Sequence, residues 1–133
     1  MVCIYCGSEK TEVVNSRQQK RSNAIWRRRT CAGCSAIVTT LEKIDLETAI
    51  IVTRKSAHQP FQRDKLFISI YESCKHRNDA QTSATMLTDT IIKQLYPLIS
   101  SASVSSRQIA TIAGKTLQRF DTAAGVQFKA YHP

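Results

Sequence analysis

The sequence predicts an α+β protein made of a small three-stranded antiparallel unit at the N-terminus and a mainly helical unit after it. Two Cys-x-x-Cys pairs bracket a short β-rich insert near the N-terminus, and apolar residues at helical spacing follow Pro60 almost to the end of the chain. A chain of 133 residues is one ordinary domain or two small ones. We therefore expect two modules, residues 1–46 and residues 47–133.

The charge of the chain indicates an anionic partner. It carries 19 Lys and Arg residues against 10 Asp and Glu, a formal net charge of +9, which favours nucleic acid or nucleotide over an acidic protein surface. A hydrophobic content of 42% excludes disorder over the whole length. No apolar run approaches the roughly 18 residues of a membrane span, and the N-terminus lacks the plan of a signal peptide. We therefore expect a cytosolic protein with no membrane partner.

The first module contains two Cys-x-x-Cys pairs of identical spacing, Cys3 with Cys6 and Cys31 with Cys34. Each pair forms a tight turn that places two thiolates on one side, and zinc prefers four such ligands in a tetrahedron. We predict one structural Zn²⁺ per chain, because four thiolates leave no open position for water. Two redox dithiols or free buried thiols remain the alternative. The fifth cysteine, Cys74, is predicted to be a small core residue.

Between and after the cysteine pairs, residues 11–16, 24–27 and 36–41 have the β-branched and aromatic character of short strands. A segment with so little apolar mass needs a metal to fold. Together the strands and the cysteines predict a zinc ribbon.

The insert between the cysteine pairs concentrates positive charge, with six basic residues and no acid from Arg17 to Arg29. These are Arg17, Lys20, Arg21, Arg27, Arg28 and Arg29. On an antiparallel hairpin Arg27 and Arg29 share one face, whereas Trp26 and Arg28 share the other. We predict that the cluster contacts nucleic-acid phosphates and base edges. A solvated basic hairpin without a partner is the alternative.

The second module begins with a predicted strand over residues 48–55, and a helix follows Pro60 with its apolar positions in one wide stripe. A second helix starts near Asp79, and Pro97 bends or ends it. The Ser-x-x-Gln capping box of residues 105–108 begins a third helix, and Asp121 caps a short fourth. The serine-rich segment 100–106 is predicted to be a loop between helices.

Four residues at the end of the predicted strand and the start of the following helix are candidates for binding a triphosphate. They are Val52, Arg54, Lys55 and Lys65. The pattern is weak by itself, and the sequence has neither a P-loop nor a dinucleotide-binding motif. The three histidines, His58, His76 and His132, are predicted to lie in a loop, at a helix end and at the terminus, without a nucleophile beside them. We therefore expect a protein that is not an enzyme.

Five stretches of the chain together resemble the NrdR family, the bacterial transcriptional repressors of ribonucleotide reductase genes. They are Cys3-x2-Cys6, Val14-Asn15-Ser16-Arg17, Arg27-Arg28-Arg29-x-Cys31-x2-Cys34, Thr39-Thr40-x-Glu42 and Gln59-Pro60-Phe61-x-Arg63-Asp64-Lys65-Leu66-x-x-Ser69-Ile70. The resemblance covers nearly the whole chain in one order and one spacing.

The resemblance implies a DNA-binding zinc ribbon at residues 1–46 and, at residues 47–133, an ATP-cone with a short β-hairpin that binds ATP or dATP. In the family the nucleotide controls a homo-oligomer that places the ribbons on operator boxes of promoter DNA, so the protein is cytoplasmic and joins the nucleoid when bound. By the same resemblance, Arg17 and Arg27 to Arg29 contact DNA. Val52, Arg54 and Lys65 line the nucleotide pocket.

The chain also departs from the family. Thr53, Lys55 and Ser56 stand where the family usually has lysine, aspartate and glycine, and Lys55 is a candidate replacement for the lost lysine. The usual helical tail after Tyr131 is absent. One alternative is therefore a zinc-ribbon nucleic-acid or protein interaction module whose degenerate cone only mediates oligomerisation. Another is a detached regulatory domain acting on the reductase enzyme, against which the run of arginines argues.

Overall fold

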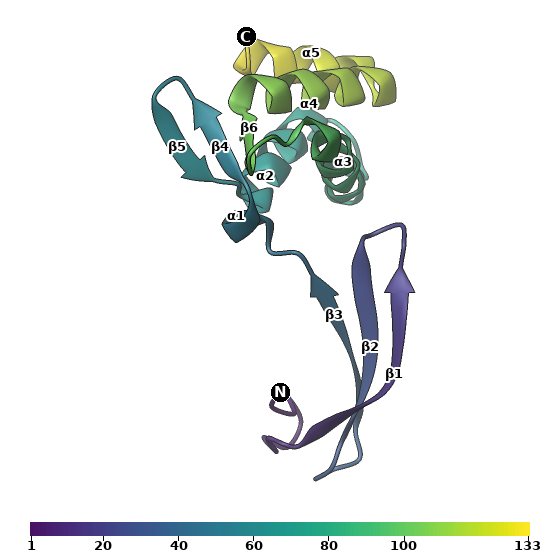
Figure 1. Cartoon of the computed structure of the whole chain (residues 1–133). Coiled ribbons are helices and arrows are strands. Elements are labelled where there is room, and N and C mark those ends of the chain that lie inside the picture. Colours follow the sequence, from purple (N-terminus) through teal and green to yellow (C-terminus); the bar gives the residue numbers. More distant parts are fainter. The chain divides into compact units, whose positions relative to one another are not determined.

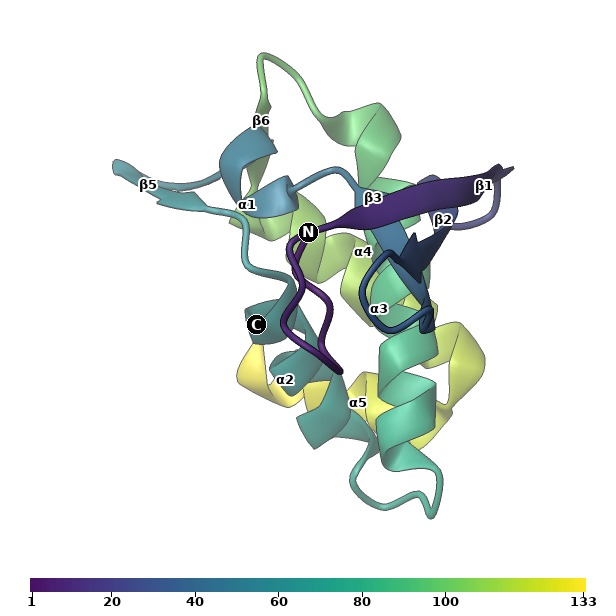
Figure 2. The same ribbon diagram turned by 90° about the horizontal axis from the view of Figure 1, so that it is seen from below.

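The computed structural model describes all residues from Met1 to Pro133. The chain divides into two compact units, Met1–Asp45 and Leu46–Pro133, which are described separately below (Figures 1 and 2). None of the helices is both long and apolar enough to cross a membrane.

The first unit is the predicted three-stranded antiparallel sheet, in the order β1-β2-β3. Its strands are β1 (Thr11–Gln19), β2 (Ala24–Cys31) and β3 (Ile37–Lys43). The prediction of this ribbon is confirmed, although β1, β2 and β3 all run further than expected because the polar and charged residues between the cysteines pair as well. The register of β1 shifts between Val13 and Asn15, which makes Val14 the extra residue of a β-bulge.

The first unit has almost no apolar core. Its only buried residues are Cys3, Ala24 and Cys31, whereas large apolar side chains such as Ile37 and Leu41 are more than half exposed. Three small buried residues remove little apolar surface from water, and this does not offset the entropy lost by ordering 45 residues. A cross-link must therefore hold this unit together.

The second unit contains a small sheet of three short strands, in the order β5-β4-β6. The predicted hairpin is formed by β4 (Ile51–Arg54) and β5 (Ala57–Pro60), and β6 (Ser103–Ser105) pairs with β4 in parallel. α1 (Leu46–Ala49) precedes this sheet as one short helical turn.

Three local predictions for this region were wrong. The strand predicted over 48–55 starts only at Ile51, because Thr48 and Ala49 belong to the turn of α1. His58 lies in β5 and not in a loop. The segment 100–106 contains β6, whose pairing partner β4 lies about fifty residues earlier in the chain, so its strand character comes from a long-range contact.

Four longer helices complete the second unit, and their ends follow the predicted signals. They are α2 (Arg63–Cys74), α3 (Ala80–Leu95), α4 (Ser106–Phe120) and α5 (Thr122–Tyr131). Pro97 ends α3 by way of the 3₁₀ turn η1 (Tyr96–Leu98). The Ser105 hydroxyl accepts from the Gln108 N–H at 3.1 Å in the predicted capping box, and Asp121 caps α5.

The helices enclose one apolar core in which Ile70, Ile91 and Leu117 are completely buried. Cys74 belongs to this core, as predicted. The helices α4 and α5 pack side by side (Figure 1), and Gly125 permits this approach. A Cβ atom on Gly125 would lie 2.8 Å from the Cα of Gln118, which is closer than real Cβ atoms come to a backbone.

Candidate functional site

The four cysteines of the first unit converge on one point. The sulfur atoms of Cys3 and Cys34 are 3.7 Å apart, those of Cys6 and Cys31 are 3.6 Å apart, and all four lie within 4.8 Å of one another. A tetrahedral zinc ion with Zn–S bonds of about 2.3 Å separates its sulfurs by about 3.8 Å. The donor set and its spacing therefore fit a tetrahedral zinc ion.

Backbone hydrogen bonds shape the two cysteine turns. The Gly7 N–H donates to the Cys3 carbonyl at 2.9 Å, and the Ser35 N–H donates to the Cys31 carbonyl at 3.0 Å. Gly7 and Ser35 both adopt positive φ, a conformation that closes a tight turn. Each cysteine pair therefore sits on a fixed loop, so both thiols of the pair face the same centre.

The thiols of the cluster affect one another's ionisation. The N–H groups of Cys34 and Gly33 lower the pKa of the Cys31 thiol to about 6. The Ser8 N–H lowers the pKa of Cys6, but contacts with the thiols of Cys31 and Cys34 outweigh it and raise that pKa to about 12. Four negative charges this close repel one another, so full ionisation of the cluster requires a cation at its centre.

The predicted arginine cluster is divided between the two faces of the sheet. Arg28 lies opposite Asn15 in the register, and Arg17 lies opposite Trp26, so these four side chains share one face. Arg17 and Arg28 are exposed and have no acidic partner. We name the residues Arg17, Trp26 and Arg28 the open face.

The opposite face carries Arg27 and Arg29. Arg27 donates to Glu42 through Nη2 at 2.9 Å and Nε at 3.3 Å, and through Nη1 to the Ser16 hydroxyl at 3.2 Å. The Nε of Arg29 is buried without a hydrogen-bond partner. Lys20 and Arg21 lie in the exposed turn between β1 and β2. The structure therefore does not bring the six predicted cations together on one surface.

Three of the four residues predicted to bind nucleotide line one cavity in the second unit. Val52, Arg54 and Lys65 border a cavity of about 260 Å³, together with apolar side chains from the hairpin and from α2, α4 and α5. Besides Val52, the apolar residues are Ala57, Pro60, Phe61, Leu66, Ile109, Ala110 and Phe128. Lys55 does not line this cavity, because it occupies the turn between β4 and β5 at φ +53° and borders a neighbouring open groove.

Comparison with known proteins identifies the family. The family model for the zinc ribbon described as "Transcriptional repressor NrdR-like, N-terminal domain" matches residues 1–42. The protein named transcriptional repressor NrdR from Gluconacetobacter diazotrophicus is 32% identical over 132 residues, which are 99% of this chain and 74% of the relative. The NrdR proteins of Sphingopyxis alaskensis and Afipia carboxidovorans are 32% and 33% identical over 99% of this chain, and 84% and 83% of their own lengths.

The chain belongs to the NrdR family. The predicted resemblance is thereby confirmed, and the zinc-ribbon match agrees with the four-cysteine cluster in supporting a structural zinc ion. The three relatives are named as transcriptional repressors and not as enzymes.

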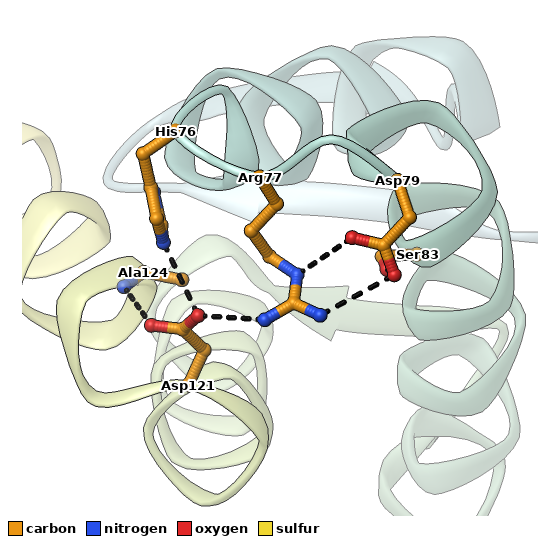
Figure 3. A network of polar contacts seen from close by, with 6 residues as sticks. All are labelled: His76, Arg77, Asp79, Ser83, Asp121 and Ala124. Atoms are coloured by element: carbon orange, nitrogen blue, oxygen red, sulfur yellow. Dashed lines mark hydrogen bonds and ion pairs between the residues drawn. The ribbon is translucent and has the colours of Figure 1, made fainter.

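The second unit of this NrdR-family chain also contains a polar network that the sequence did not reveal. The Arg77 guanidinium lies between two carboxylates, donating to Asp79 at 2.8 Å and to Asp121 at 2.9 Å (Figure 3). The His76 ring is 3.1 Å from Asp121, and the Arg77 guanidinium lies 4.7 Å from the Phe120 ring centre. The network joins the turn before α3 to the junction between α4 and α5.

The network shifts the ionisation of its carboxylates. The Ala124 N–H, with Arg77 and His76, holds the pKa of Asp121 well below its usual range. Arg77 and the Ser83 hydroxyl lower the pKa of Asp79 in the same way. Because its contacts hold the turn before α3 to the junction between α4 and α5, we assign the network to stability.

Four further cations lie beside the predicted sites but were not predicted as site residues. The alternation of side chains along strands and the spacing of residues on a helix are the signals that identify them. Lys43 lies opposite Ala24 in the register and therefore extends the open face onto β3. On α4, Arg107, Lys115 and Arg119 follow one another at intervals that are multiples of four residues, and all three border the open groove beside the cavity.

Proposed function

We propose that the chain is a nucleotide-sensing transcriptional repressor of ribonucleotide reductase genes. Residues 1–46 form the ribbon that binds double-stranded operator DNA, and residues 47–133 form an ATP-cone that binds ATP or dATP and controls a homo-oligomer. Membership of the NrdR family supports the repressor function. The finer parts of the proposal are argued from the residues of each unit below.

The open face carries the proposal of DNA binding. Arg17 and Arg28 are exposed and unpaired on one side of the sheet, and Lys43 lies on the same side. Guanidinium groups form bidentate hydrogen bonds with phosphate oxygens and with the major-groove edge of guanine. Arg27 is held by Glu42, so its contribution to DNA binding is expected to be smaller than that of Arg28. Lys20, Arg21 and Arg29 remain proposed contacts from the turn and the opposite face.

Zinc, held by Cys3, Cys6, Cys31 and Cys34, is a structural ion that fixes the ribbon in this proposal. The bound ion neutralises thiolate charge and joins the turn before β1 to the end of β2 and the turn after it, which orders the strands that carry the arginines.

The cavity of the second unit supports the proposal of nucleotide binding. Its apolar lining suits a purine ring, while Arg54 and Lys65 supply positive charge for phosphates at its border. A nucleotide that binds one oligomeric form more tightly than another shifts the population toward that form, and the affinity for operator DNA follows by linkage.

Two titrations test the proposal. The purified zinc-loaded protein is titrated onto labelled duplex from the promoter of its own organism's reductase genes by fluorescence anisotropy, and with ATP and dATP by calorimetry. We expect salt-dependent duplex binding and saturable binding of at least one nucleotide. Absence of duplex binding contradicts the repressor function.

The matched variants Arg28→Ala and Arg27→Ala test the open face. Both remove one arginine from neighbouring positions of β2. Arg28→Ala should weaken duplex binding about tenfold, or about 1.4 kcal/mol, and Arg27→Ala should weaken it less because Arg27 is paired with Glu42. Nucleotide affinity should stay unchanged in both variants. An Arg27→Ala effect as large as that of Arg28→Ala contradicts the assignment of the open face.

The position of Lys55 favours one second candidate. With threonine at 53 and Lys55 outside the cavity, the cone holds fewer cations around its cavity than the family pattern provides. A cone without nucleotide affinity would leave a zinc-ribbon interaction module that only oligomerises. Calorimetry that detects neither nucleotide, together with an intact oligomer by light scattering, would support this candidate.

A further inference from the structure

The second unit has an open groove with strongly positive walls. The groove has a volume of about 1380 Å³ and is bordered by the hairpin turn, α4 and α5. Its six cationic side chains are Arg54, Lys55, Arg107, Lys115, Arg119 and Lys129. No aspartate or glutamate borders it.

The groove cations differ from three other cations of this unit, which are paired with carboxylates. Arg63 pairs with Asp89, Lys75 with Glu72, and Arg77 with Asp79 and Asp121. The six groove cations form no ion pair, and all six are exposed. Unpaired charges of one sign that gather in one groove repel one another unless an anion is present. The groove therefore has the charge of a binding surface for an anion.

The length of the row of cations on α4, formed by Arg107, Lys115 and Arg119, distinguishes among possible anions. Arg107 and Arg119 are twelve residues apart on one helix, which is about 18 Å at 1.5 Å per residue. This is much longer than three linked phosphates of one nucleotide. Each strand of duplex DNA carries one phosphate per about 3.4 Å of the helix axis, so a row of this length spans several successive phosphates. Arg107, Lys115 and Arg119 also lie outside the nucleotide cavity.

We propose that this groove is a second contact surface for the phosphate backbone of double-stranded DNA, in addition to the ribbon. The inference rests on the proposed function, since it requires that the protein binds duplex DNA. Contacts from α4 to phosphates carry no sequence information, so they add affinity and salt dependence to operator and random duplex alike. The ribbon supplies the sequence preference.

The test compares the double variant Lys115→Ala/Arg119→Ala with the control Lys93→Ala. Lys93 is an exposed, unpaired cation on α3 that does not border the groove, and alanine suits all three helical positions. Duplex affinity is measured by anisotropy at several salt concentrations, with the promoter duplex and a random duplex of equal length. The double variant should bind both duplexes about tenfold more weakly, with a salt slope reduced by roughly two. Lys93→Ala should match the unmodified protein.

Four outcomes separate this inference from the proposed function. If the unmodified protein binds no duplex, both fail. If Arg28→Ala weakens binding while the double variant behaves like Lys93→Ala, the groove inference fails and the proposed function stands. The inference is also overturned if the double variant loses ATP or dATP affinity in calorimetry with duplex affinity unchanged. It is likewise overturned if light scattering shows that the double variant changes only the oligomer, because the groove then binds a second copy of the chain.

Discussion

The two units of the chain reach a stable fold by different means. The ribbon of Met1–Asp45 buries only three small residues and depends on a four-thiol cluster, whereas Leu46–Pro133 packs four helices around a continuous apolar core. Because the metal holds the ribbon, neither face of its sheet is needed for packing, and arginines stand on both. In the second unit the inner helix faces are used by the core, so the cations lie on outer surfaces, among them the groove side of α4 and α5.

Removing a metal ligand should have the largest effect, and it should unfold one unit while leaving the other folded. Cys31→Ser should abolish stoichiometric zinc binding and unfold the ribbon completely, because a structural site contributes the folding free energy of its unit. The helices of the second unit should keep their circular dichroism. Zinc is quantified by a colorimetric assay.

The fifth cysteine provides the control for this experiment. Cys74 lies in the apolar core and not in the metal cluster, so Cys74→Ala should still bind one zinc ion per chain. Loss of the buried side chain should lower the free energy of unfolding of the second unit by about 1 kcal/mol. Zinc loss in Cys74→Ala, or a folded ribbon in Cys31→Ser, would contradict the claim that the metal stabilises the first unit and the apolar core stabilises the second.

A cavity in the apolar core should destabilise the second unit and leave the zinc-bound ribbon folded. Leu117 is completely buried, so Leu117→Ala should lower the free energy of unfolding of the second unit by about 2–5 kcal/mol. Urea denaturation followed by the helical circular dichroism signal measures this loss. Zinc should remain bound through the helical transition, and its release together with the helices would show that the two units unfold as one.

The contact between α4 and α5 gives a smaller effect with a matched control. Gly125→Ala places a Cβ 2.5 Å from the Gln118 side-chain oxygen and 2.8 Å from its Cα, so it should cost about 1–3 kcal/mol. A Cβ at Gly114 would meet only the Phe128 ring, at 3.8 Å. Gly114→Ala should therefore be neutral or stabilising by up to about 1 kcal/mol, as alanine favours helix. Equal thermal midpoints for the two variants would refute the close packing at Gly125.

The smallest expected effect is the acid sensitivity of the Arg77 network. The pKa of Asp121 is held below its usual value in the folded unit, so its contribution is present above the unfolded pKa of about 4 and is lost as pH falls below it. The helical thermal midpoint should fall with acidification, and Asp121→Asn should show a lower midpoint at neutral pH with a shallower pH dependence.

The ion pair of Arg63 and Asp89 is the control for the network. Asp89→Asn breaks an exposed 2.7 Å pair on the surface of the same unit, so it should hardly change the midpoint at neutral pH. If Asp121→Asn and Asp89→Asn have the same midpoint and the same pH profile, the network does not stabilise the junction.

The features that the sequence predicted correctly depend on neighbours in the chain. The spacing of the cysteine pairs, the Ser105 capping box and the Asp121 cap each act within a few residues, so a local pattern contains them. The strand β6 and the Arg77 network depend on contacts between segments tens of residues apart, and no local pattern contains those. Strand alternation correctly separated Arg27 from Arg28, but the pairing of Arg27 with Glu42 required the third strand.

The most direct test of the account is duplex binding before and after zinc removal in the intact chain. Chelation should abolish preference for the promoter duplex over random duplex while leaving the helical circular dichroism unchanged, because only the ribbon depends on the metal. Weak, salt-sensitive binding to both duplexes should remain through the groove on α4. Retention of promoter preference by the zinc-free protein would contradict the claim that the metal-held ribbon reads DNA.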